Sequence, residues 1–430
     1  MADVPLNQLS AVEVTRGVAD GRFSCEDVTR ACLARVETRE DRVGAWIHID
    51  PDQAIAQARA QDRAGRTGLL LGATVGVKDI IDTFDMPTGM GSPIYDGNRP
   101  LADASCVGLS RAAGAVILGK TVSCEFAGRT PGRTSNPHDA TRTPGGSSSG
   151  SGAAVADFMA HLAFGTQTAG SVLRPSAYCG IVGYKPTFNS FNRAGIKFAA
   201  ESLDTIGLHA RTVGDIDLFA AALTGRDTLE ARPVESAPTI GLCRTPMWDK
   251  AEAESRAALE DAAARLEKAG CSVRDFILPN SFSGLEAARN TLNDVERWRV
   301  MAYEWAHARD AISPALRDIV RRGGEVPHSD YLAALVLAED CRAQMAGLLD
   351  GYDFILSPSA NGEAPVGLDW TGDPAFQGLW TTLHAPSITL PTHKGPNGMP
   401  VGIQLIGRRY EDTRLLADAD WVLNRLGAWR

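Results

Sequence analysis

The spacing of apolar and polar residues along this chain predicts alternating strands and helices. Residues 69–81, LLLGATVGVKDII, are a nearly continuous apolar run and predict a buried strand or strand-turn-strand. Residues 238–278 predict a β-α-β unit, with the strand TIGLC, a helical pattern over 251–269 ended by Gly270, and the strand CSVRDFIL. Because strands and helices alternate, the class predicted is α/β with a mostly parallel or mixed sheet.

The remaining elements follow from capping and periodicity signals. Ser10 with Glu13, and Ser24 with Asp27, match the capping pattern at helix N-termini, so residues 1–65 are expected to be helical. Further expected elements are a short helix and the strand AVIL within 104–118, a buried helix over 152–163, a mostly helical stretch over 285–350, strands at 352–358, 387–391 and 400–407, and a terminal helix over 412–426. Residues 224–237 are expected to form an exposed connection.

Composition excludes several classes of partner. The chain has 430 residues, a net charge of −9 and no basic run, so nucleic acid is not an expected partner. It has no apolar run long enough to span a membrane and no secretory leader, so a cytoplasmic protein is expected. The eight cysteines are scattered without a Cys-x-x-Cys pair, which indicates buried thiols in a reducing compartment. The eight histidines form no ligand-spaced cluster, so no metal is expected.

Lys78 is the first candidate for chemistry, because apolar residues flank it in VGVKDII. A buried ammonium is costly, so such a lysine either pairs with an anion or loses its proton. A neutral lysine can act as a general base for a serine. The alternative is a lysine at a strand end that points to water or pairs with Asp79 or Asp82.

Two clusters of glycine and serine flank an apolar segment within residues 143–186. The first cluster places Ser147 after two glycines, and the second places Ser171 after Gly170. Glycine permits tight or positive-φ backbone, so that amide N–H groups can converge on one point. A hydroxyl beside converging amides supplies a nucleophile and an oxyanion site, which acyl transfer requires. The alternative is a Ser/Gly-rich turn with helix caps.

The segment 143–186 resembles the amidase signature family, whose hallmark is a GGSS cluster followed by G-T-x-x-x-G-S-x-x-x-P. The segments GATVGVKDIIDT, TSNPHDATRTPGGSSSGS, LDTIGLHARTV, HAPSITLP and MPVGIQLIGRR are also similar to family segments, so the resemblance covers nearly the whole chain. GTQTAGSVLRP is more similar to a malonamidase-like subgroup than to the GTDTGGSIR type. The resemblance implies one amidase domain over residues 1–430, with an N-terminal helical segment (1–65), a signature core (66–225) and a remainder (238–430). Its expected fold is a single large α/β/α layered domain with a central mixed, mostly parallel sheet.

The resemblance also implies a Ser–Ser–Lys triad. Ser171 corresponds to the nucleophile, Ser147 to a bridging serine that follows a cis peptide bond, and Lys78 to the base. The backbone N–H groups of Thr168, Ala169, Gly170 and Ser171 are expected to hold the oxyanion. No cofactor is implied.

Substrate-binding candidates surround these positions. Arg174 lies three residues after Ser171, where it can bind a substrate carboxylate through two parallel hydrogen bonds. The alternative is a structural arginine paired with an internal acid. The resemblance places Gly89, Met90 and Gly91 in a loop that lines the acyl pocket, and an ordinary glycine turn is the alternative.

Two positions depart from the family pattern. Many members carry Asp where this chain has Gln167, and Gly where it has Ala169. Gln167 is counted with the substrate-binding candidates, and it removes a negative charge from the site. Ala169 requires that its backbone avoid a conformation open only to glycine.

The predicted function is a hydrolase of C–N bonds in small amides, through a Ser171 acyl-enzyme and with a substrate carboxylate held by Arg174. Carbamates, ureas and aryl amides are alternative substrates. An amidotransferase subunit that passes ammonia to a partner is an alternative of another class, and a silent binding protein is disfavoured because all three triad positions are present. A homodimer is left open. Residues 114–121 match the phosphate-loop pattern, but Ala-Val-Ile-Leu at the loop positions favours a strand.

Overall fold

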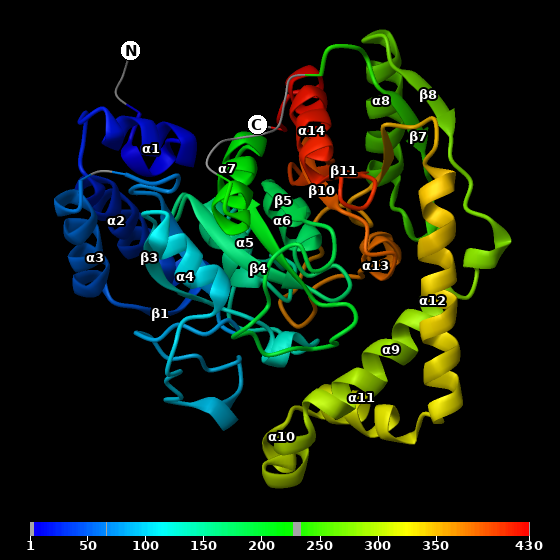
Figure 1. Ribbon diagram of the computed structural model, residues 1–430, viewed down its shortest axis with the longest axis horizontal. Helices are drawn as coiled ribbons and strands as arrows, with labels where there is room; N and C mark the ends of the chain where they lie inside the picture. The colour runs from blue at the N-terminus through cyan, green and yellow to red at the C-terminus, as the bar shows by residue number, and fades with distance from the viewer. Residues whose placement is uncertain (1–3, 66, 227–233, 430) are drawn as a thin grey trace.

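The computed structural model describes residues 4–65, 67–226 and 234–429. In this part of the chain one eleven-stranded sheet runs through the molecule, in the order β1-β3-β2-β4-β6-β5-β10-β11-β9-β7-β8 (Figure 1). Its strands are β1 (Trp46–Ile49), β2 (Thr74–Lys78), β3 (Val116–Thr121), β4 (Leu162–Gln167), β5 (Val182–Lys185), β6 (Thr205–Ala210), β7 (Thr239–Leu242), β8 (Ser272–Asp275), β9 (Phe354–Pro358), β10 (Ser387–Lys394) and β11 (Pro400–Ile406). The α-helices of these residues are α1 (Ala11–Ala19), α2 (Cys25–Val43), α3 (Pro51–Arg63), α4 (Ser105–Ala112), α5 (Ser149–Ala156), α6 (Leu173–Cys179), α7 (Val213–Thr224), α8 (Ala253–Lys268), α9 (Leu285–Val300), α10 (Ala302–His307), α11 (Pro314–Glu325), α12 (His328–Leu348), α13 (Ala375–Thr382) and α14 (Asp412–Leu426).

The sheet is mixed, as predicted, but the expectation that it is mostly parallel is wrong. Six of the ten strand pairings in the described residues are antiparallel, and only β3-β2-β4 and β9-β7-β8 run parallel. The reason lies in the connections. A turn of a few residues joins β10 to β11, and a turn that short can connect only antiparallel neighbours.

Apolar cores cover both faces of the sheet. One contains Val75 and Val77 of β2 together with buried residues of α4, α7, α8 and α14. The other contains Val116 and Leu118 of β3 together with buried residues of α2, α3 and α5. Successive residues of a strand point to opposite faces of the sheet. Because Val75 and Val77 of β2 face the first core, the residue that follows them, Lys78, points to the opposite face.

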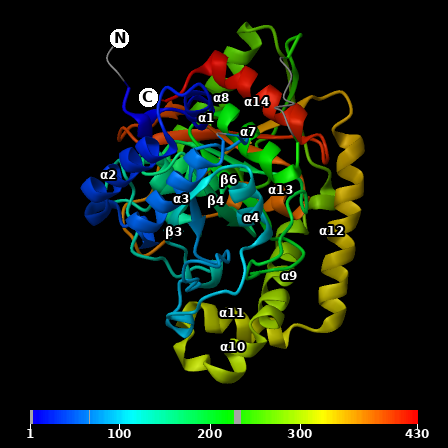
Figure 2. The same cartoon turned by 60° about the vertical axis from the view of Figure 1, so that its left-hand side comes forward.

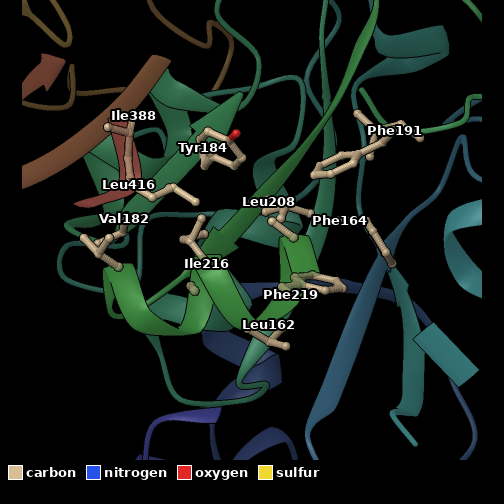
Figure 3. Packing of buried hydrophobic residues seen from close by; sticks show 14 of the residues in the cluster. Leu162, Phe164, Val182, Tyr184, Phe191, Leu208, Ile216, Phe219, Ile388 and Leu416 are labelled. Carbon is tan, nitrogen blue, oxygen red and sulfur yellow. The ribbon is translucent and has the colours of Figure 1, made fainter. Parts of the chain in front are cut away.

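Figure 3 shows part of the first core. Ile216 and Phe219 of α7 lie over Leu162 and Phe164 of β4 and over Leu208 of β6. The rings of Phe164 and Phe219 are 4.6 Å apart. This packing holds β4 rigidly, and β4 leads directly into the segment that contains Ser171.

The predicted elements agree with the structure in most places, but two expectations are wrong and several elements were not predicted. The predicted capping boxes at Ser10 and Ser24 are present, but residues 1–65 also contain the strand β1 between α2 and α3. The helix expected over 152–163 spans α5 (149–156) instead. The chain then reverses at Phe158, whose φ is 59°, and enters β4, a strand the prediction missed. Strands β5 and β6 and helices α6, α7 and α13 were also not predicted.

The C-terminal half agrees more closely. The β7-α8-β8 unit, the helical stretch 285–350, strands β9, β10 and β11, and helix α14 all form as expected. Of the exposed connection expected over 224–237, residues 227–233 lie outside the described residues. Helices α9–α12, here called the helical arm, extend from the sheet as the two views show (Figures 1 and 2).

Candidate active site

Lys78 lies at the end of β2 on the face opposite Val77. Its side chain is fully buried, and its Nζ donates to Ser147 Oγ at 2.8 Å and to Thr166 Oγ1 at 2.9 Å. A weaker contact of 3.4 Å reaches the Thr166 carbonyl oxygen of β4, the strand beside β2. The structure therefore brings two of the predicted triad residues, Lys78 and Ser147, into direct contact.

Burial lowers the pKa of Lys78 from its ordinary value of 10.5 to about 7. The positive charges of Arg297 and Arg174 act in the same direction, whereas Cys124 and Asp204 oppose the change. The amine is therefore neutral in a large fraction of molecules near pH 7, which is the protonation state that a general base requires.

The alternative interpretation, in which Lys78 points to water or pairs with Asp79 or Asp82, is wrong. A second buried lysine, Lys120 of β3, is the residue that faces Asp79, with Nζ 3.7 Å from Oδ1. Lys120 also donates to the Ile81 carbonyl oxygen at 2.7 Å and to Thr88 Oγ1 at 2.6 Å. Strand alternation separates Lys78 from its sequence neighbour Asp79, so that in the described residues Lys78 pairs with the hydroxyls of Ser147 and Thr166 and with no acid.

Ser147 is positioned by a turn that only glycine can form. Gly145 has a φ of 82°, and a Cβ there would lie 2.9 Å from the backbone of Pro175. The peptide bond between Gly146 and Ser147 is cis, as the resemblance predicted. The Ser147 carbonyl oxygen accepts a hydrogen bond of 3.1 Å from the backbone N–H of Cys124, which fixes the turn against the end of β3.

Ser171 lies in the short loop between β4 and α6, adjacent to the Ser147 turn. The backbone N–H of Ser148 donates to the Ser171 carbonyl oxygen at 3.3 Å, so the two glycine-serine clusters are in contact. No acceptor among the described residues pairs with the backbone N–H groups of Thr168, Ala169, Gly170 and Ser171. Backbone N–H groups without acceptors are available to a substrate oxygen, and whether these four converge on one point stays a prediction.

Gln167 shapes this loop from inside the protein. Its Oε1 accepts from the backbone N–H groups of Val172 and Leu173 at 2.9 and 3.0 Å, and its Nε2 donates to Thr381 Oγ1 at 3.0 Å. The side chain is fully buried, and these contacts support a positioning role. The φ of Ala169 is not positive. Alanine is therefore tolerated at a position where many family members carry glycine.

Arg174 is buried behind the Ser147 turn. Its Nη2 donates to the Gly146 carbonyl oxygen at 2.6 Å and to Thr371 Oγ1 at 3.2 Å. Its Nε and Nη1 are buried without a hydrogen-bond partner, and no acid in the described residues forms an ion pair with it. The alternative of an internal ion pair is therefore wrong for this part of the chain, and two N–H donors are free to bind an acceptor.

The loop that contains Gly89, Met90 and Gly91 is fastened to Asp79. The backbone N–H groups of the two glycines donate to the Asp79 carboxylate at 3.1 and 3.4 Å, and that of Met90 donates to its carbonyl oxygen at 2.9 Å. Gly91 has a φ of 64° and packs tightly against the carbonyl oxygens of Ser123 and Cys124. These contacts place the loop beside the segment that holds the Ser147 turn, and its role in lining an acyl pocket stays a prediction.

Three contributors were missed at the sequence level. Thr166 is the second hydroxyl partner of Lys78, and Thr371 is the side-chain partner of Arg174. Asp204, fully buried, accepts from the Thr168 hydroxyl and from the backbone N–H of Ala200 at 3.2 Å, and so holds the start of the nucleophile loop. Thr166 and Asp204 stood in segments noticed for their family resemblance, in GTQTAGSVLRP and LDTIGLHARTV, whereas Thr371 stood in none.

The chain resembles known proteins over nearly its full length. The family model described as Amidase matches residues 27–416. This match covers most of the chain and is sufficient to assign the family. The chain belongs to the amidase family. A glutamyl-tRNA(Gln) amidotransferase subunit from Anaeromyxobacter sp. (strain K) is 32% identical over 477 residues, covering 98% of this chain and 97% of that protein.

Solved structures of the family agree. One described as an amidase is 29% identical, with a TM-score of 0.89, and covers 97% of this chain and 100% of that one. Another, a peptide amidase in complex with the competitive inhibitor chymostatin, is 28% identical with a TM-score of 0.86 and covers 99% of each chain. These matches confirm the amidase signature fold but do not confirm the malonamidase-like subgroup, because the curated relatives are amidotransferase subunits.

Two kinds of feature are absent from the described residues. None of their helices combines the length and apolarity that crossing a bilayer requires. No group of three or more His, Cys, Asp or Glu side chains within them is arranged to hold a metal ion.

Proposed function

We propose that this amidase releases ammonia or an amine from a small, carboxylate-bearing amide by acyl transfer to Ser171. The observation that carries the proposal is the contact of a buried, partly neutral lysine with Ser147, in the turn that touches the Ser171 loop. Family membership supports cleavage of a C–N bond.

The proposed reaction moves one proton along the three side chains. Neutral Lys78 accepts the proton of Ser147, and Ser147 accepts the proton of Ser171 as the Ser171 oxygen attacks the amide carbon. The free N–H groups of residues 168–171 stabilise the oxyanion. When the C–N bond breaks, the same path returns the proton to the leaving nitrogen. Water then attacks the acyl-enzyme and restores the Ser171 hydroxyl.

Arg174 is the proposed carboxylate-binding residue. Its two unpartnered donors, Nε and Nη1, lie on different edges of the guanidinium, so each can donate a single charge-assisted hydrogen bond to a carboxylate oxygen, and a buried arginine without an acid gains most from a charged partner. Arg174→Met is therefore expected to raise KM for a carboxylate-bearing amide at least about tenfold, while KM for a neutral amide of equal size changes little. Equal losses on both substrates would contradict this role.

A second candidate is an amidotransferase subunit that delivers ammonia to a partner protein. The names of the curated relatives favour this candidate over a free small-amide hydrolase. The 477 aligned residues exceed the 430 of this chain, so the relative carries segments that this chain lacks. The site chemistry is the same in both cases, and only the fate of the ammonia differs.

A substrate panel on the isolated chain tests the proposal and separates the two candidates. The panel contains carboxylate-bearing amides, neutral aliphatic amides, aryl anilides, carbamates and ureas, with Ser171→Ala as the blank. Steady turnover of an acidic amide without any partner supports the free hydrolase. Activity that appears only when a partner is added supports the amidotransferase role. Turnover that survives Ser171→Ala would contradict the proposed mechanism altogether.

A further inference from the structure

A second arginine stands at a cavity next to the nucleophile loop. Arg289, on α9 of the helical arm, lines a small, partly open pocket together with Thr245, Met247, Glu286, Asp373 and Pro374. The opposite wall comes from the N-terminal part of α13. Pro374 of that wall also packs against Gly170, where a Cβ would lie 3.1 Å from the Pro374 Cβ. One short segment therefore borders both the cavity and the predicted oxyanion site.

The arginine packs closely into this wall. Gly378 of α13 has no side chain at the point where Arg289 packs, and a Cβ there would lie 2.9 Å from Arg289 Nε. Only Nη2 of Arg289 has a partner in the described residues, the neighbouring Asn290 Oδ1 at 3.0 Å. Glu286, one turn earlier, forms no ion pair with it in this part of the chain. The guanidinium thus keeps donors for a molecule in the cavity.

Arg289 shares its electrostatic surroundings with Arg174. Asp373 and Arg129 influence the pKa of both guanidinium groups. Asp373 is itself paired with Lys250, at 3.0 Å, so its charge is already balanced. Since Lys250 balances Asp373, the three arginines (Arg129, Arg174 and Arg289) face one unbalanced acid among the described residues of the pocket, Glu286, and this excess of positive charge attracts anions.

We propose that Arg289 is a second anion-binding residue of the active site, so that the substrate is an amide with two separate carboxylates, one held by Arg174 and one by Arg289. This inference rests on the proposed function and narrows its substrate class. The two arginines come from different parts of the fold, α6 and the helical arm, and face the same segment 371–374. A substrate that bridges them is held at two points, which orients its amide toward the loop of Ser171.

Protection of Ser171 against a fluorophosphonate probe tests the inference. The competitors are dicarboxylates from malonate to adipate and monocarboxylates of the same chain lengths. In the wild-type protein we expect the best dicarboxylate to protect at a concentration at least about tenfold lower than its monocarboxylate counterpart, since a charge-assisted contact is gained. Arg289→Gln should abolish this difference, and Arg289→Lys should restore part of it.

Glu286→Gln is the matched control, because it changes a charge on the same helix and in the same cavity wall. It should leave the preference for dicarboxylates unchanged or strengthen it. Equal protection by both acid classes in the wild type, or equal losses in Arg289→Gln and Glu286→Gln, would overturn the inference.

Isothermal titration calorimetry measures the binding of the same acids without requiring a reactive serine. It therefore separates the proposal for Arg289 from the proposed acyl transfer to Ser171. Absent labelling of Ser171 contradicts the proposed function. If labelling is intact but no Arg289-dependent preference is found, only the inference fails.

Discussion

Replacing Lys78 with Met should change the stability of the protein in a strongly pH-dependent way. Lys78 is fully buried, and its pKa falls from 10.5 to about 7 on folding. Between these two values the unfolded chain binds a proton that the folded protein has released. The free energy of unfolding of the wild-type protein therefore rises with pH across this window. Lys78→Met removes this contribution because methionine does not titrate.

The size of the effect follows from the pKa values. One unit of pKa difference corresponds to about 1.36 kcal/mol, so between pH 7 and pH 10 the Lys78 contribution is roughly 3–4 kcal/mol. A constant loss is added, since Ser147 and Thr166 lose their partner at about 1–3 kcal/mol in all. At pH 7 the wild-type protein still carries the cost of the depressed lysine pKa, about 4 kcal/mol, which methionine does not. The variant should therefore be at least as stable as the wild type at pH 7 and should lose about 3–4 kcal/mol relative to it by pH 10.

Urea unfolding of both proteins at pH 7 and pH 10 measures this difference. Contributions from the other buried lysines, Lys120 and Lys185, are common to both proteins and cancel. With the steep urea dependence of a large chain, the midpoint difference should shift by roughly 1 M between the two pH values. A midpoint difference that is the same at both pH values would refute the reasoning that burial holds this amine neutral. A Lys78→Met variant with full activity would refute the role of Lys78 as base.

Four further outcomes are expected. The kcat/KM of the wild-type protein should fall tenfold per pH unit below about pH 7, as Lys78 becomes protonated, and a flat profile between pH 5 and 7 would contradict its role as base. Ser147→Ala should lower kcat by about 10²–10⁴ while KM changes little, measured on the best substrate of the panel. Gln167→Leu should slow fluorophosphonate labelling of Ser171 more than Gln167→Glu does, because glutamate still accepts the two backbone N–H groups; equal rates would remove the positioning role. Lys120→Met should destabilise the fold by about 3–5 kcal/mol in urea, because Asp79 is left buried without its cation; a loss below 1 kcal/mol would show that the pair is dispensable.

The candidate triad positions stood out because a family motif covers Ser147 and Ser171 and a family segment covers Lys78. Ser147 and Ser171 each lie in a glycine-rich cluster that has few other uses, and Lys78 stands alone in an apolar strand. The partner of Lys78 could not be predicted in the same way. Asp79 is its nearest acid in sequence, and only the alternation of β2 and its pairing with β3 assign that acid to Lys120.

Strand β4, helix α6 and the long-range contacts of the two arginines have no periodic or capping signal in the sequence. The strand β4 follows α5 after a reversal at Phe158, a left-handed residue without a glycine signal. Helix α6 has seven residues and contains Pro175, so no helical period could develop. The pairing of Arg174 with Thr371 joins positions 197 residues apart, and the packing of Arg289 on Gly378 joins α9 to α13. Such contacts depend on tertiary packing, which periodicity does not encode.

The placement of the helical arm has a consequence for how this protein can diversify. In the proposed mechanism, bond cleavage depends on β2, β4 and the two glycine-serine turns, all within residues 74–173, whereas Arg289 comes from helix α9 of the helical arm. Mutations in the arm can therefore remodel which molecules are admitted while the proton path stays intact. The part of specificity proposed for Arg289 is encoded apart from the reacting residues, so selection can act on it without dismantling them.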